Sequence, residues 1–134
     1  MRCEVRIIIK FANYSFFYII FALQVCYNTM RITFEDTALE ELYVNGATNS
    51  SKYRKLPQDL IKQYIKVVNY IRAARRLEDL FCIKSLHYEK KKGDLQGVDA
   101  VWINRQYRLL FHSSPDEDGI VVNALLFEIS KHYE

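Results

Sequence analysis

The sequence has little cysteine, glycine or proline. Its 134 residues include three Cys, four Gly and two Pro. Cys3, Cys26 and Cys82 are widely spaced and form no CxxC pair, which argues against a disulfide framework and against a zinc site. This usage is typical of a reduced, cytosolic protein. The scarcity of Gly and Pro excludes collagen-like and linker-like chains.

The sequence also lacks the short motifs of several enzyme classes. It contains no glycine-rich phosphate loop and no GxSxG, HExxH or EF-hand pattern. Its three histidines, His87, His112 and His132, do not have the close spacing of metal ligands. We therefore expect neither a metal nor a cofactor, and we consider only reactions that need none.

The composition is that of a globular domain with an uneven charge distribution. Hydrophobic residues make up 50% of the chain and charged residues 26%, which is enough apolar mass for a real core. Residues 52–108 hold fourteen Lys and Arg against six Asp and Glu, whereas residues 30–51 and 109–134 are acidic. A basic middle between acidic ends favours contact with a polyanion. A set of solvated helix faces is the alternative.

Residues 1–29 differ in composition from the rest of the chain. Three basic residues precede an apolar run over residues 11–25, as in a signal peptide, but no small-residue cleavage site follows. The run is shorter than the ~20 apolar residues of a membrane span. We expect translation to begin at Met30, with a signal peptide or a structured extension as alternatives. A single domain is expected over residues 30–134.

The apolar pattern predicts two helices after a short opening strand. Residues 31–35 alternate weakly, as a strand does, and Asp36 or Thr37 can cap a helix that ends near Gly46. Pro57 suits the first position of a second helix. The apolar stripe of this helix consists of Leu60, Ile61, Tyr64, Val67, Val68 and Ile71. We expect the two helices to pair as a hairpin.

The remainder of the chain predicts mainly strands. In chain order we expect a helical turn (77–81), an extended segment (83–86), a polar loop (87–97), a hairpin of two strands (98–103 and 106–112), a turn (113–119) and a last strand (120–129). The hairpin turn falls at Asn104-Arg105. This order predicts an α+β fold, in which the N-terminal strand and the two-helix hairpin pack with a mainly antiparallel sheet.

Several basic and proton-transferring side chains suit a phosphodiester substrate. Arg108 lies in an apolar strand, so it needs an acidic partner or a functional reason. Guanidinium and ammonium groups stabilise the charge of a pentavalent phosphorane, and His or Tyr can move protons. The candidates are Lys90, Lys91, Lys92, Arg105, Arg108, Lys131, His132 and Tyr133. The alternative for the three lysines is a solvated loop, and for Arg108 it is an ion pair within the sheet.

Residues 86–111, LHYEKKKGDLQGVDAVWINRQYRLLF, resemble the HigB-type "killer" toxins of the RelE/ParE superfamily. These toxins commonly show a KLKG-like loop, a short gap and a strand pair similar to SIRINDQYRICF. The matching positions are Lys92-Gly93, Gly97, Ile103-Asn104 and Gln106-Tyr107-Arg108. The resemblance extends over residues 30–134, with the opening strand and helix included.

The chain departs from the family pattern at three places. The family's frequent Arg before the hairpin turn is replaced by Trp102, and its common ending Asp-Tyr-His is replaced by KHY at residues 131–133. His87 matches the histidine of the family's LHPLKG form only with two extra residues before the lysine and glycine. The anion-binding roles of Lys92 and Arg108 therefore carry over best, and the identity of base and acid stays open.

The resemblance implies a RelE/ParE-like α+β domain that cleaves messenger RNA in the ribosomal A site and so inhibits translation. The ribose 2′-hydroxyl attacks the adjacent phosphate, and no metal takes part. The implied partners are the ribosome, mRNA and a HigA-like antitoxin with a helix-turn-helix domain. The implied location is the cytoplasm, without a membrane partner for the mature domain.

The resemblance also implies roles for the candidate residues. We expect Arg108 and Lys92 to hold the scissile phosphate, His132 to transfer a proton, and Tyr133 to orient or stack on a base. The expected RNA-binding residues are Lys90, Lys91, Arg105, Lys131 and His87. Two alternatives are a ParE-like toxin that inhibits DNA gyrase without cleaving RNA, and an inactive remnant or interaction module of the same fold.

Overall fold

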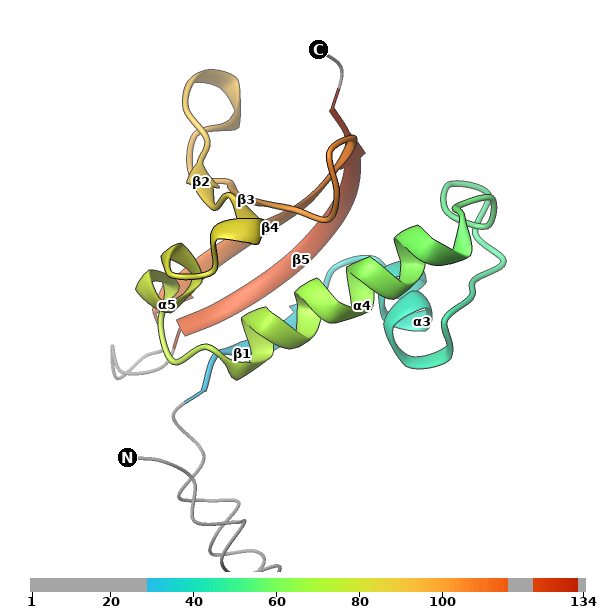
Figure 1. Cartoon of the computed structure of the whole chain (residues 1–134), viewed down its shortest axis with the longest axis horizontal. Coiled ribbons are helices and arrows are strands. Elements are labelled where there is room, and N and C mark those ends of the chain that lie inside the picture. The colour runs from blue at the N-terminus through green and yellow to red at the C-terminus, as the bar shows by residue number, and fades with distance from the viewer. Residues whose placement is uncertain (1–28, 116–121, 133–134) are drawn as a thin grey trace, which may run out of the picture.

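A computed structural model of the chain describes residues 29–115 and 122–132, and these form one layer of helices against one sheet (Figure 1). The sheet has the strand order β1-β5-β4-β3-β2. The strands are β1 (Arg31–Phe34), β2 (Glu89–Lys90), β3 (Asp99–Trp102), β4 (Tyr107–Pro115) and β5 (Val122–Lys131). Only β1 and β5 pair in parallel; the other neighbouring strands are antiparallel. The predicted α+β class is confirmed.

The helices of the described residues lie between β1 and β2 along the chain. They are α3 (Thr37–Asn45), α4 (Gln58–Ala73) and α5 (Leu77–Phe81). Two short 3-10 turns follow, η1 (Lys84–Leu86) before β2 and η2 (Gly93–Leu95) after it. In Figure 1, α4 runs across one face of the sheet with α3 beside its N-terminal half. Within the described part of the chain, no helix is long and apolar enough to cross a membrane.

Helix α3 begins and ends where its capping residues predict. The Asp36 side chain accepts a hydrogen bond from the Ala38 backbone N–H at 2.9 Å, which satisfies one of the N–H groups that the first turn leaves unpaired. Gly46 ends the helix with φ of 72°, and its N–H donates to the Leu42 carbonyl. Glycine adopts this left-handed conformation without a steric penalty.

Helix α4 presents its predicted stripe to the sheet. All six stripe residues are buried, whereas Lys62, Lys66 and Arg72 on the other face are exposed. Pro57 is the N-cap of α4 and not its first helical residue, so the predicted position was wrong by one. The Tyr64 hydroxyl donates to the Leu39 carbonyl at 2.9 Å, which joins α4 to α3 inside the core. The predicted helix pairing is confirmed.

The sheet separates two apolar clusters of unequal size. The main core fills the space between the helices and the sheet, and Tyr53, Tyr64 and Phe111 are its largest fully buried side chains. On the other face of the sheet, a small cluster consists of Val98, Ala100 and Leu110, with Phe127 packed against it. A register shift between Leu110 and Phe111 in the β4–β5 ladder leaves Phe127 as the extra residue.

Three predicted boundaries were wrong. In the predicted extended segment over residues 83–86, only Ile83 is extended, and residues 84–86 form a 3-10 turn that buries Leu86 to 1% exposure. The polar loop over residues 87–97 contains β2, which pairs with β3. Strand β4 continues to Pro115 through the start of the predicted turn, because it pairs with β5 up to that residue. The rest of that turn, residues 116–119, lies outside the described residues.

The hydrogen bond between the two helices generates a stability prediction. Tyr64→Phe removes the hydroxyl that donates to the Leu39 carbonyl in the core, so we expect the free energy of unfolding to fall by about 0.5–1.5 kcal/mol. Tyr43→Phe is the matched control, because its hydroxyl bonds to Asn69 at the surface. We expect the control to change stability by less than about 0.5 kcal/mol. Urea denaturation measures both, and equal losses would contradict a special role for the buried bond.

Candidate functional site

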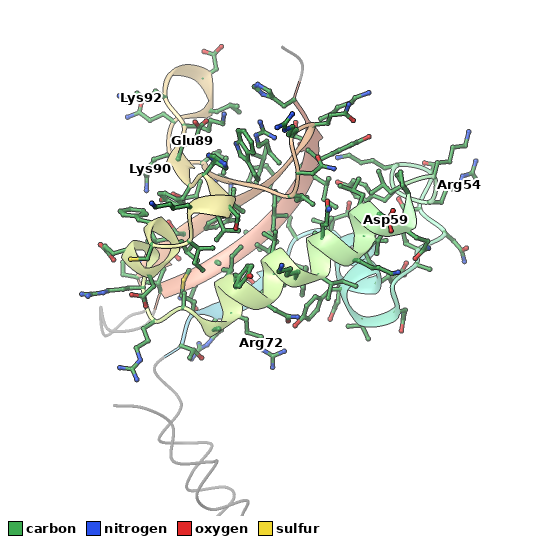
Figure 2. The ribbon with its side chains drawn as sticks, viewed as in Figure 1. Arg54, Asp59, Arg72, Glu89, Lys90 and Lys92 are labelled. Atoms are coloured by element: carbon green, nitrogen blue, oxygen red, sulfur yellow. The ribbon has the colours of Figure 1, made fainter. Side chains whose placement is uncertain are left out.

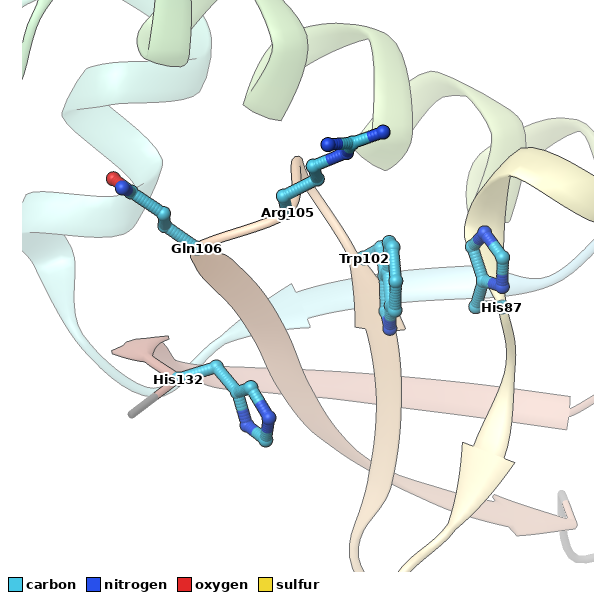
Figure 3. A pocket seen from close by; sticks show the side chains of 5 residues that line it. All are labelled: His87, Trp102, Arg105, Gln106 and His132. Atoms are coloured by element: carbon cyan, nitrogen blue, oxygen red, sulfur yellow. The ribbon is translucent and has the colours of Figure 1, made fainter. Parts of the chain in front are cut away.

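An open pocket of about 730 Å³ lies where three distant parts of the chain meet at one end of the sheet (Figure 3). His87 follows η1, Trp102 ends β3, Arg105 and Gln106 form the β3–β4 turn, and His132 follows β5. These five residues line the pocket, which we call the histidine pocket. The segments are brought together by strand pairing and not by closeness in sequence.

The β3–β4 turn is fixed by its own polar groups. The side-chain oxygen of Asn104 accepts hydrogen bonds from the backbone N–H groups of Gln106 and Tyr107, both at 2.8 Å. An Asn side chain that bonds forward along the chain stabilises a tight turn. The His132 N–H donates to the Gln106 carbonyl at 2.6 Å. This last bond holds the end of β5 against the turn, so His132 and Arg105 line the same pocket.

Arg108 lies behind the turn and joins its backbone to the sheet. Its side chain is buried, at 7% exposure. The Nη1 atom donates to the carbonyl oxygens of Asn104 (2.8 Å), Arg105 (3.1 Å) and Tyr107 (3.2 Å). The guanidinium carbon lies 4.1 Å from the centre of the Trp102 ring, its cross-strand neighbour. Backbone carbonyls and an aromatic face stabilise a cation that the interior would otherwise disfavour.

Trp102 is stacked between two groups. The His87 ring is nearly parallel to it, with the two ring centres 3.8 Å apart and an angle of 28° between the planes. Strand β3 lies between β4, which carries Arg108, and β2, which His87 precedes, so the two groups reach the Trp102 ring from opposite sides. Figure 3 shows His87 and Trp102 side by side, with His132 across the pocket. The result is a three-layer stack of imidazole, indole and guanidinium.

The structure brings together some of the predicted site residues. His87, Arg105 and His132 line the histidine pocket, and Arg108 supports its turn from behind. The predicted contact of Arg108 with a phosphate stays a prediction. Lys131 is exposed at the end of β5. Tyr133 lies outside the described residues, so its predicted role stays a prediction as well.

The three predicted lysines surround a second pocket. This pocket of about 500 Å³, the lysine pocket, is lined by Lys90, Lys91, Lys92, Gly93, Gln96 and Gly97. Figure 2 shows Lys90, at the end of β2, and Lys92, on the loop that follows β2. Lys92 is therefore not among the residues that line the histidine pocket, and its predicted partnership with His132 at one phosphate stays untested.

A buried carboxylate anchors the root of the lysine pocket. Asp99 is fully buried and accepts hydrogen bonds from the Tyr88 hydroxyl and, at 2.5 Å, from the Ser113 hydroxyl. The Lys90 Nζ lies 3.6 Å from Asp99 Oδ1. Burial, and then the hydrogen bond and charge of Asp99, raise the pKa of Tyr88, so the phenol remains a donor at neutral pH. The partner of Lys90 is thus a buried carboxylate, whereas the partner of Lys91 is Glu89, which is exposed at the surface.

The residues that sequence reasoning missed are Trp102, Gln106 and Asp99. Trp102 was missed because the predicted two-residue turn at Asn104-Arg105 places it opposite Tyr107, whereas the observed turn is one residue longer and pairs it with Arg108. Asp99 gives no local signal either, since its hydroxyl partners come from separate segments. Among the described residues, no group of three or more His, Cys, Asp and Glu side chains is placed to hold a metal ion.

The contacts of Arg108 generate a second prediction. Arg108→Lys keeps the charge but loses the guanidinium, whose Nη1 bonds three carbonyls while its carbon lies over the Trp102 ring, so we expect the free energy of unfolding to fall by about 1–3 kcal/mol. Arg105→Lys, on the exposed tip of the same turn, is the control and should leave stability nearly unchanged. Urea denaturation compares the two. A lysine variant of Arg108 as stable as the parent would contradict the turn-holding role.

Comparison with known proteins identifies the family. Residues 32–128 match the HigB-like toxin family, described as the RelE-like toxin of the type II toxin–antitoxin system HigB. Toxin HigB-1 of Vibrio cholerae serotype O1 is 27% identical over 97 residues, which cover 72% of this chain and 95% of that protein.

Two solved structures are also similar over 78% of this chain. The YoeB/ParE toxin from Agrobacterium tumefaciens is covered over 100% of its length at 10% identity, with a TM-score of 0.47. The heterotetrameric YoeB–YefM toxin–antitoxin complex from Staphylococcus aureus contains a chain covered over 98% at 19% identity, with a TM-score of 0.45. The family assignment comes from the sequence match over residues 32–128, which confirms the resemblance: the chain belongs to the HigB-like family of RelE-like toxins of type II toxin–antitoxin systems.

Proposed function

We propose that this toxin is a ribosome-dependent endoribonuclease that cleaves mRNA and so inhibits translation. Family membership supports a toxin of a type II toxin–antitoxin system. The observation that carries the proposal is the histidine pocket, where the His132 imidazole and the Arg105 guanidinium line one open space. A proton-transfer group beside a cation is what cleavage of a phosphodiester requires.

In the proposed reaction the RNA supplies its own nucleophile. The ribose 2′-hydroxyl loses its proton, its oxygen forms a bond to the adjacent phosphorus, and the bond from phosphorus to the 5′-oxygen breaks. The leaving 5′-oxygen takes up a proton, and a 2′,3′-cyclic phosphate remains. His132 is the proposed proton-transfer residue, and Tyr133 is proposed to orient or stack on a base. The step needs no metal, because substrate and side chains provide every group.

Positive charge near the pocket has two proposed tasks. Arg105, on the tip of the turn, is proposed to contact the phosphate whose charge increases in the transition state. Arg108 holds that turn in place, and it is also proposed to help hold the scissile phosphate. Lys91 and Lys92 are proposed to bind backbone phosphates of RNA at the lysine pocket. Lys131 is proposed to extend this surface beside His132.

We also propose that the toxin binds an antitoxin with a HigA-like helix-turn-helix domain. The support is the family description, which places these toxins in type II toxin–antitoxin systems. A neighbouring gene for a small helix-turn-helix protein would provide the partner for a direct binding assay.

Mapping of mRNA 5′ ends after brief induction tests the nuclease proposal. We expect cuts within translated codons, and we expect His132→Gln to reduce them by about 10²–10⁴-fold, the usual contribution of a general acid or base. His112→Gln is the control, because its exposed ring stacks on Phe127 outside the pocket. Toxicity with no codon-associated cuts, accompanied by gyrase inhibition, would favour the ParE-like alternative. Absence of both toxicity and cleavage would favour an inactive remnant.

The salt dependence of ribosome binding tests the lysine pocket. Lys91→Gln with Lys92→Gln removes two charges and leaves Lys90 to compensate the buried Asp99. Each lost phosphate contact should reduce the slope of log affinity against log salt by about 0.7 for single-stranded RNA, or about 1.4 in total. Lys62→Gln with Lys66→Gln on α4 makes the same charge change elsewhere and should leave the slope nearly unchanged. Equal slopes for the two double variants would remove the lysine pocket from the interface.

A further inference from the structure

The outermost layer of the three-layer stack is an exposed aromatic ring. One face of the His87 imidazole contacts Trp102, and because the residue is exposed, the opposite face is open to a ligand. Trp102 in turn rests on Arg108, which is 7% exposed and bonded to three backbone carbonyls. The exposed ring is therefore supported by two layers that are themselves tied to the sheet.

The backbone conformation of His87 is a second, independent observation that its side chain is held in one position. Its φ of 43° and ψ of 48° are left-handed, and it is the sole non-glycine residue with positive φ among the described residues. Such conformations persist only where the surrounding structure determines them, and they cluster at ligand-binding sites. The conformation and the stack together hold one imidazole rigidly at the wall of the histidine pocket.

We propose that the outer face of His87 is a stacking platform for an unpaired nucleobase of the RNA whose phosphate enters the histidine pocket. This inference rests on the proposed function. Every base has a π-face, and unpaired RNA bases stack on His, Phe, Tyr and Trp side chains. Trp102 lies between His87 and His132, so the outer face of His87 is turned away from His132, and the stacked base belongs to a nucleotide further along the RNA than the two that the cleaved bond joins. His87 contributes an aromatic surface, and the proton transfer belongs to His132.

The test separates stacking from proton transfer by two substitutions. His87→Phe keeps a flat aromatic ring but has no titratable proton, and His87→Asn tolerates the left-handed backbone but has no ring. Cleavage of a short mRNA on programmed ribosomes gives kcat and KM for each variant. We expect His87→Asn to raise KM about tenfold with kcat little changed, because a stack formed equally in ground and transition states affects binding alone. His87→Phe should restore KM to within a few-fold of the parent.

A second experiment measures binding of the base directly and does not depend on cleavage. A short single-stranded RNA with 2-aminopurine at successive positions reports stacking through quenching, which we expect with the parent and His87→Phe but not with His87→Asn. Urea denaturation shows whether each variant stays folded, because the emission of Trp102 changes with the group stacked on it and cannot report folding here. A His87→Phe variant as impaired as His87→Asn, or a fully active His87→Asn, would overturn the platform. A parent that quenches 2-aminopurine but cuts no mRNA would overturn the nuclease and leave the platform standing.

Discussion

The geometry of the histidine pocket depends on a buried cation. The Arg108 guanidinium lies within the sheet, where an ionised group is costly unless its donors find acceptors. Two carbonyls of the β3–β4 turn and that of Tyr107 at the start of β4 are among those acceptors, and the guanidinium carbon lies 4.1 Å from the Trp102 ring centre. The turn therefore cannot relax without exposing or orphaning the guanidinium. Because His132 is bonded to the same turn, the end of β5 depends on this interaction as well.

The sheet keeps two basic regions apart and stabilises each by a different buried group. Arg108 supports the turn that carries Arg105, whereas the carboxylate of Asp99 anchors Lys90 at the root of the lysine pocket. Both buried groups lie on paired strands, β3 and β4, so their separation is fixed by the ladder. The ladder therefore holds two basic regions, the turn with Arg105 and the loop with Lys91 and Lys92, at a fixed distance from each other.

Much of the fold could be predicted because its signals are local. The six-residue stripe predicted the buried face of α4, and Asp36 and Gly46 predicted the ends of α3. Errors arose where burial of one residue decided the backbone, as with Leu86 and the 3-10 turn that buries it. The pairing of β2 with β3 was missed for a related reason. A two-residue strand has no periodicity of its own, and its partner defines it.

The sequence by itself determined the class of fold, the family, the hairpin that carries Arg105 and Arg108, and the basic character of the middle of the chain. The family follows from the resemblance to HigB-type toxins, and the others follow from nearest neighbours or from composition. The tertiary structure alone decided which candidates share a pocket, because His87 and His132 are 45 positions apart and meet through strand order. It also decided that Trp102 is stacked on both faces, since that requires a guanidinium from one strand and an imidazole from a loop to converge on one ring. Such convergence is a property of packing in three dimensions, and no spacing along a single chain encodes it.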